Sequence, residues 1–184
     1  MLKILIPLFL IITTANAQRN GLLSLNKDKV YDAYTLVYPH NQPTVFLLNN
    51  CGQIVHRWDD ESTSRPGNTA YLMSDGRLVK TRRPANVSLD TIWAGGGGDE
   101  IAIVDWDNNE LWSYKLNNGK ERLHHDIKVM PNGNILAIAW ENLSKEAAID
   151  LGRDPALLSQ DKLWPDFIFE INPTTNQIIW EWHI

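Results

Sequence analysis

One hairpin pattern recurs three times along the chain and constrains the fold more than any other feature. Each copy is an apolar strand, a polar turn and a second strand that ends in an aromatic residue. The copies are Val45 to Trp58, Ile101 to Tyr114 and Phe167 to Trp182, with Asn49, Asp105 and Asn172 at the same turn position and Trp58, Tyr114 and Trp182 at the same strand end. Apolar strands on both sides of a polar turn predict β-hairpins.

A second type of hairpin alternates with the first. Tyr71 to Thr81 matches Ile127 to Ala137, with Asp75-Gly76 in place of Asn132-Gly133. Asp-Gly and Asn-Gly favour tight hairpin turns because they tolerate positive φ. Copies of one type lie roughly 55 to 65 residues apart, which is room for four short strands in each repeat. The pattern predicts an all-β chain, a partial β-propeller of two to three blades, with the strand-end aromatics filling the space between neighbouring blades.

Two segments interrupt this pattern. Ser144 to Gly152 carries a serine suited to an N-cap, helix-forming residues and a terminal glycine, so it predicts a short helix, and 153–158 predicts a further turn. This helical insertion is expected to lie over one end of the propeller, where loops carry function. The run 95–98 is all glycine, but no Lys-Ser/Thr pair follows it, so a phosphate-binding loop is excluded. We expect a flexible connection into the strand at Ile101.

The first residues predict a signal peptide, residues 1–17. Lys3 is the charged n-region, residues 4–12 are apolar, and Ala15-Asn16-Ala17 is a small-x-small cleavage site. The apolar run is too short to span a bilayer. Residues 18–184 are therefore expected to form the propeller domain, in a secreted or periplasmic protein that has no membrane segment beyond the signal peptide.

Charge and cysteine content exclude several classes of function. The formal net charge is −5, so no basic surface for nucleic acid is expected. A single cysteine, Cys51, excludes an intramolecular disulfide and a thiolate zinc cluster, and we interpret it as a turn residue. The Arg82-Arg83 pair is expected to be a solvated strand end rather than an anion site. The oligomeric state stays open.

The candidate site is the sequence His124-His125-Asp126, at the start of the strand that leads into a Pro-Asn-Gly-Asn turn. Adjacent residues on a strand point to opposite faces, so one imidazole can enter a pocket while its neighbour packs sideways. His125 is either the pocket residue or a structural histidine near a turn. Asp126 either orients an imidazole or accepts backbone N–H groups, and the sequence leaves both readings open.

Several motifs in order resemble the bacterial aryl-sulfate sulfotransferase family, from about Tyr34 to the last residue. They are Tyr34-Thr35-Leu36, the Asn-Cys-Gly turn with Trp58, His124-His125-Asp126 with its Pro-Asn-Gly-Asn turn, Gly152 to Leu158, Leu163 to Asp166, and Asn172 to Thr175 leading to Trp180-Glu181-Trp182-His183. The resemblance implies an exported six-bladed propeller that moves a sulfuryl group from a phenolic sulfate ester to a phenol. It also implies that no nucleotide or other cofactor is needed and that the reaction passes through a sulfated histidine near the propeller axis.

The resemblance carries over to a few residues only. His125 matches a family histidine that lines the sulfate pocket, so His125 and Asp126 are the candidate catalytic residues. His124 and His183 are candidate substrate-binding residues, and no metal site is expected. The family's nucleophilic histidine and its arginine are expected beyond Ile184, so the chain is interpreted as the N-terminal portion of such an enzyme.

Two alternatives remain. The first is a non-catalytic secreted propeller that binds a ligand or a protein partner, because a fold does not determine a function. The second, a metal-dependent hydrolase, is weaker because His124 and His125 point apart and no carboxylate-rich ligand set accompanies them.

Overall fold

The computed structural model describes residues 22–60, 64–84, 95–158 and 161–184, so the predicted signal peptide lies outside the described residues. The strands are β1 (Thr35–Val37), β2 (Thr44–Leu48), β3 (Ile54–Asp59), β4 (Ser64–Leu72), β5 (Leu78–Pro84), β6 (Glu100–Val104), β7 (Glu110–Lys115), β8 (Glu121–Val129), β9 (Ile135–Glu141), β10 (Leu143–Ser144), β11 (Lys162–Leu163), β12 (Asp166–Asn172) and β13 (Gln177–His183). The predicted all-β class is confirmed. No helix in the described part of the chain is long and apolar enough to cross a membrane.

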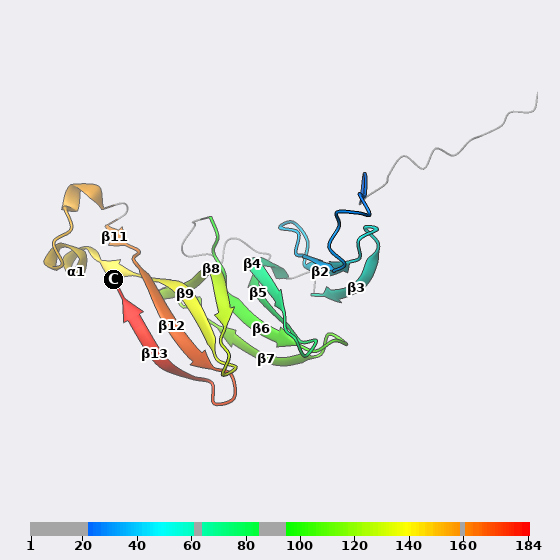
Figure 1. The fold of residues 1–184 in the computed structure, drawn as a ribbon. Coiled ribbons are helices and arrows are strands. Elements are labelled where there is room, and N and C mark those ends of the chain that lie inside the picture. The colour runs from blue at the N-terminus through cyan, green and yellow to red at the C-terminus, as the bar shows by residue number, and fades with distance from the viewer. Residues whose placement is uncertain (1–21, 61–63, 85–94, 159–160) are drawn as a thin grey trace, which may run out of the picture.

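Three antiparallel sheets follow one another along the chain (Figure 1). Their strand orders are β1-β2-β3, β4-β5-β6-β7 and β8-β9-β12-β13, and β10 pairs with β11 in a small separate ladder. Both types of hairpin predicted from the repeat are present, since β2-β3, β6-β7 and β12-β13 are copies of the first and β4-β5 and β8-β9 are copies of the second. The sheets lie side by side in an arc, which is the arrangement of a partial β-propeller.

The first strand of each sheet lies at the same edge, which we call the inner edge (β1, β4 and β8). β4 and β8 are neighbours there, and the Tyr71 hydroxyl on β4 donates a 2.8 Å hydrogen bond to Asp126 Oδ1 on β8. Inner strands of successive blades face the axis of a propeller, so this edge is where a central site would form.

Apolar cores lie between the sheets. The core between the first two sheets holds Val45, Leu47, Trp58, Leu78 and Val104. The core between the second and third sheets includes Val79, Ile101 and Ile103 from the second sheet and Phe167, Phe169 and Ile171 from the third. Adjacent residues on a strand face opposite sides, so Leu78 and Val79 of β5 belong to different cores. The middle sheet is therefore buried on both faces.

The strand-end aromatics fill two of these interfaces. Trp58 is fully buried, and its indole N–H donates to the Asp105 carbonyl at 3.0 Å. Tyr114 packs against Phe169 with ring centroids 6.0 Å apart. Trp182 is 49% exposed, because no described sheet packs on that face of the third sheet. The prediction that these aromatics pack between blades is thus confirmed for Trp58 and Tyr114 only.

The shared turn position has a common physical role. In each first-type hairpin the side-chain oxygen at this position accepts a hydrogen bond from a backbone N–H further along the turn. The bonds run from Gln53 N to Asn49 Oδ1 (3.0 Å), from Asn109 N to Asp105 Oδ1 (2.7 Å) and from Thr174 N to Asn172 Oδ1 (2.8 Å). Short Asn and Asp side chains suit such turns, which explains their recurrence. Cys51 lies exposed in the first of them, as predicted.

The predicted helical insertion is present between β9 and β12. Helix α1 spans Lys145–Asp150, and the Ser144 hydroxyl oxygen accepts a 3.2 Å hydrogen bond from the backbone N–H of Ala147. A single 3-10 turn follows over Pro155–Leu157. The insertion projects from the same end of the third sheet as β10 and β11 (Figure 1).

Arg82 corrects the prediction of a solvated strand end. Its side chain is only 13% exposed and lies 2.8 Å from Asp60 and 2.6 Å from Glu110. Asp60 also lies 2.8 Å from Lys80 Nζ, with both of these side chains almost fully buried. Burial lowers the pKa of Lys80, and Asp60 offsets part of that effect. Because Asp60 follows β3 and both cations are on β5, the network joins the first sheet to the second.

We predict that Asp60→Asn destabilises the fold strongly. The amide keeps the size of the carboxylate but leaves Lys80 and Arg82 without their shared counter-ion in a buried place, which costs about 3–5 kcal/mol. The free energy of unfolding from denaturant titration measures this loss. Asp75→Asn is the control, because the Asp75–Arg77 pair is about half exposed and such pairs contribute little. Equal losses in the two variants would contradict the role given to Asp60.

Candidate functional site

The inner strands β4 and β8 carry the same irregularity. The pairing of β4 with β5 shifts register between Pro66 and Ala70, and the pairing of β8 with β9 shifts between Leu123 and Ile127. The displaced segments are Gly67-Asn68-Thr69 and His124-His125-Asp126. β-Bulges commonly re-aim side chains beside functional sites. The histidine doublet thus lies on a bulge that β8 shares with β4, which the sequence pattern did not show.

The backbone of His125 is held in an uncommon conformation. Its φ is +51°, in the left-handed region that residues other than glycine rarely adopt. Its N–H donates a 2.7 Å hydrogen bond to the Gly96 carbonyl, and the Asn68 side-chain amide donates to the same oxygen. One carbonyl therefore ties the bulge of β4 to the bulge of β8, while the His125 side chain stays exposed.

The glycine run 95–98 leads into β6 as predicted, but it is packed rather than flexible. A Cβ on Gly96 would overlap the His125 ring, and a Cβ on Gly97 would overlap the guanidinium of Arg122. Gly98 N–H also donates to the Leu123 carbonyl at 2.7 Å. The absence of side chains is what lets this loop approach β8 closely, which corrects the prediction of a flexible connection.

His124 is the buried member of the doublet, with 6% exposure. Its ring stacks on Trp140 with centroids 4.1 Å apart, and its Nε2 lies 3.1 Å from Asp166 Oδ1. Its Nδ1 lies 2.8 Å from Nδ1 of His125. Burial lowers the pKa of His124 below its ordinary value, although Asp166 opposes the shift, so the ring is neutral at neutral pH. One imidazole is exposed and the other packed, as expected, but the prediction that the two rings point apart is wrong. The bulge breaks the strand alternation, and their Nδ1 atoms lie in contact.

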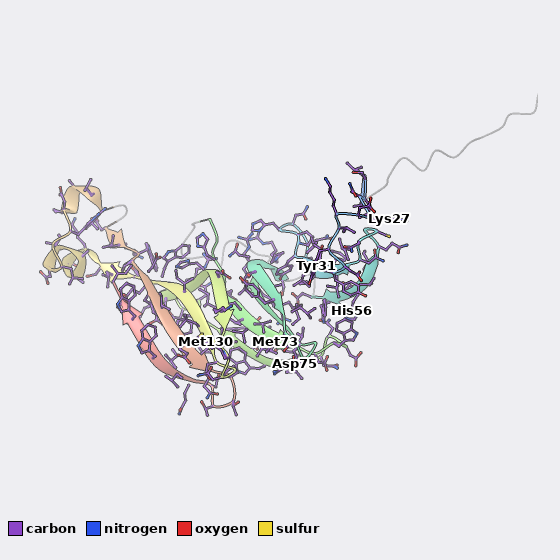
Figure 2. All side chains as sticks on the ribbon, in the orientation of Figure 1. Lys27, Tyr31, His56, Met73, Asp75 and Met130 are labelled. Carbon is purple, nitrogen blue, oxygen red and sulfur yellow. The ribbon has the colours of Figure 1, made fainter. Side chains whose placement is uncertain are left out.

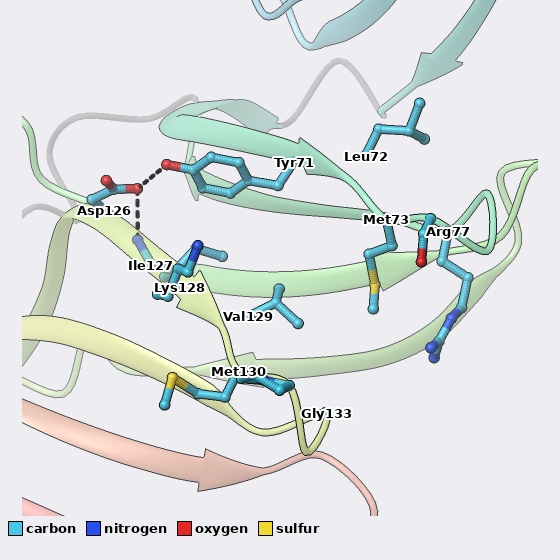
Figure 3. A pocket seen from close by; sticks show the side chains of 12 residues that line it. Tyr71, Leu72, Met73, Arg77, Asp126, Ile127, Lys128, Val129, Met130 and Gly133 are labelled. Carbon is cyan, nitrogen blue, oxygen red and sulfur yellow. Dashed lines mark hydrogen bonds between the residues drawn. The ribbon is translucent and has the colours of Figure 1, made fainter.

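The hydrogen bonds of the Asp126 carboxylate go to groups other than the two rings. Its Oδ1 accepts hydrogen bonds from the Tyr71 hydroxyl and from the backbone N–H of Ile127, both at 2.8 Å (Figure 3). Of the two readings that the sequence left open for this carboxylate, the structure shows the backbone contact. The carboxylate beside the doublet is that of Asp166, on β12. Asp166 and His124 are far apart in the sequence, so no local pattern could have identified Asp166 as the carboxylate of this site.

His183 is not brought together with the doublet. On β13 it pairs with Phe167, which pairs with Ala139 on β9, which pairs with Leu123 on β8. Three strand spacings, roughly 14 Å, therefore separate His183 from β8. Its Nδ1 lies 3.0 Å from Glu141 Oε1, and this hydrogen bond raises its pKa.

An open cleft of about 580 Å³ lies between the inner strands, next to the bulge of β8. Its apolar lining includes Met73 from the end of β4 and Val129 and Met130 from β8 and its turn (Figure 2, Figure 3). Arg77 and Lys128 add positive charge, and the Tyr71–Asp126 pair closes one end. Apolar surface beside a few charged groups suits an aromatic ligand that carries an anionic group. Within the described residues, no cluster of three His, Cys, Asp or Glu could hold a metal ion.

The chain is similar to one known protein family and to proteins of known structure. A sequence model of the family described as "Arylsulfotransferase (ASST)" matches residues 12–184. A search of the curated proteins found no match. Among solved structures, a protein of unknown function from Bacteroides caccae is similar at 13% sequence identity and a TM-score of 0.49, over 83% of this chain and 41% of that chain. The chain thus spans less than half the length of that protein.

We predict that Gly96→Ala disturbs the doublet and destabilises the fold. Its φ of +85° and the nearby imidazole both oppose a Cβ, and such overpacking typically costs about 1–3 kcal/mol. Denaturant unfolding and the NMR signals of the His125 ring measure the two effects. Gly95→Ala is the matched control, because a Cβ there meets nothing within 4 Å. An unchanged His125 ring in Gly96→Ala would show that the loop does not hold it.

We also predict that two histidines titrate on opposite sides of their ordinary pKa of 6.5, His124 below it and His183 above it. The depressed pKa of His124 makes its contribution to folding less favourable as the pH falls below about 6.5, because the unfolded chain then binds the proton more readily. The raised pKa of His183 stabilises the fold below that pH, and this effect is lost as the pH rises through its folded value. NMR titration of the ring protons measures both, and Glu141→Gln should return His183 toward 6.5.

Proposed function

The chain belongs to the arylsulfotransferase family, and from this premise we propose that it carries part of the site of an aryl-sulfate sulfotransferase. In this proposal a sulfuryl group passes from a phenolic sulfate ester to a phenol through a histidine, without a nucleotide donor. The observation that carries the proposal is the exposed His125 ring, which the bulge of β8 presents at the inner edge. The signal peptide predicted for residues 1–17 supports an exported protein, secreted or periplasmic.

His125 is assigned to the sulfuryl group because of its chemistry and its position. A neutral imidazole is nucleophilic near pH 7, and it also exchanges protons there. The ring is exposed, while its backbone is tied to Gly96 and its Nδ1 to His124. The ring also packs against Gly96, so it is held in place although it is exposed. A reacting group held in this way is pre-organised to meet a substrate. Asp126 supports this position indirectly, by joining β8 to β4 through Tyr71.

The cleft between β4 and β8 supports a place for the aromatic part of the donor. Met73, Val129 and Met130 offer apolar and polarisable contacts to a ring. Lys128, two residues after Asp126, supplies positive charge for the sulfate oxygens, whereas Arg77 is paired with Asp75 at the other end of the cleft. His183 lies three strands away from the doublet, too far to share this contact with a substrate.

The proposed function predicts that His125→Ala loses sulfuryl transfer. The full chain is incubated with a chromogenic aryl sulfate, with and without a phenol acceptor, and release of the coloured phenol is followed. We expect acceptor-dependent release by the wild type and a loss of at least about 100-fold in the variant, the usual scale for a group that assists proton transfer. His40→Ala is the control, because His40 is exposed and contacts Arg83 in another part of the molecule.

Two outcomes would contradict the proposal. Release that is unchanged by His125→Ala would remove this histidine from the reaction. A folded wild-type chain that binds the aryl sulfate without releasing phenol would favour the alternative, a propeller that binds a ligand at the same cleft.

A further inference from the structure

We propose that Asp166, acting through His124, is a positioning residue that fixes the proton of neutral His125 on Nδ1 and leaves its Nε2 with a free lone pair. The inference rests on the proposed function for its relevance to catalysis, but the arrangement of protons can be tested without any activity. It concerns residues from β12 and β8 that meet only in the folded chain.

The first step is the tautomer of His124. Nε2 of His124 lies 3.1 Å from Asp166 Oδ1, although the two are not aligned as a hydrogen bond. A carboxylate attracts an N–H and repels a nitrogen lone pair at this distance, so its charge favours the proton on Nε2. A neutral imidazole has one N–H and one lone pair, so Nδ1 of His124 is then an acceptor.

The second step passes this constraint to His125. The two Nδ1 atoms lie 2.8 Å apart, a hydrogen-bond distance at which one must donate and the other accept. Since Nδ1 of His124 accepts, Nδ1 of His125 donates. The remaining nitrogen of a neutral His125, Nε2, has no proton, which is the form required of a nucleophile or a general base.

The surroundings of His124 keep this arrangement in place. Its side chain is 4% exposed and stacks on Trp140. Turning the ring over would keep that stacking but would place carbon atoms where Nδ1 and Nε2 now meet His125 and Asp166. The titratable groups that face it are Asp166 from β12 and His125 from its own strand, while β9 contributes the uncharged Trp140 and the Ala139 carbonyl. The lowered pKa of His124 agrees with a neutral ring. Such a ring determines which nitrogen of His125 donates, without carrying a charge itself.

The experiment reads the two ring nitrogens of His125 by ¹⁵N–¹H correlation NMR on the full chain, at about pH 9, where an imidazole is neutral. In the wild type we expect a protonated Nδ1 and an unprotonated Nε2. Asp166→Ala removes the carboxylate beside His124, and His124→Phe keeps a ring on Trp140 but removes the acceptor for His125. Both variants are expected to move the Nε2 signal of His125 toward the protonated range, as the two tautomers mix.

Asp150→Ala is the matched control, because Asp150 is an exposed carboxylate on α1, and its spectrum should equal that of the wild type. A wild-type His125 protonated on Nε2 would overturn the inference, and so would an unchanged His125 in both folded variants. The backbone amide spectra show whether each variant is folded. Because there are two variants, the test remains possible if one of them misfolds.

A kinetic measurement separates this inference from the proposed function. If the wild type transfers sulfuryl groups, Asp166→Ala should lower kcat by about 10- to 100-fold with little change in KM, the usual cost of losing a group that orients a reacting residue. An active enzyme whose kcat is unaffected by Asp166→Ala overturns the positioning role. A wild type with the predicted tautomer and no transferase activity supports the relay and refutes the proposed function alone.

Discussion

Each sheet of this protein has two apolar faces and cannot bury both of them by itself. The middle sheet meets this requirement by packing between two others, so Leu78 and Val79, neighbours on β5, enter different cores. The buried ion pairs of Asp60 with Lys80 and Arg82 join the first sheet to the second. Stacking of sheets in sequence order is the constraint on which every other feature depends, because it aligns their first strands at one edge.

The candidate site is a product of that alignment. β4 and β8 become neighbours, and the two bulges that they carry come close enough for the Gly96 carbonyl to accept hydrogen bonds from both. The Tyr71–Asp126 hydrogen bond and the cleft also lie between β4 and β8. His125 can be exposed and yet fixed, because its backbone is hydrogen-bonded and its ring contacts Gly96 and the buried ring of His124.

Much of the fold could be predicted from local patterns. The turn residues Asn49, Asp105 and Asn172 recur because each must accept a backbone hydrogen bond, and Ser144 precedes the helix because it caps it. These interactions span only a few residues. The bulge in β8 was missed, because apolar and polar residues do not mark where the register shifts. The packing of the glycine run could not be predicted, because the His125 ring and the Arg122 guanidinium that it contacts lie on another strand.

The sequence alone determined the family resemblance and the choice of the histidine doublet as the candidate site. Both depend on short motifs whose residues are adjacent in the chain. Tertiary structure decided which partners they meet. It placed Asp166 against His124, directed Asp126 to Tyr71 and set His183 three strands away, on β13. The physical reason is that hydrogen bonds and ion pairs depend on distances of a few ångströms, and only the stacking of distant strands brings these groups so close.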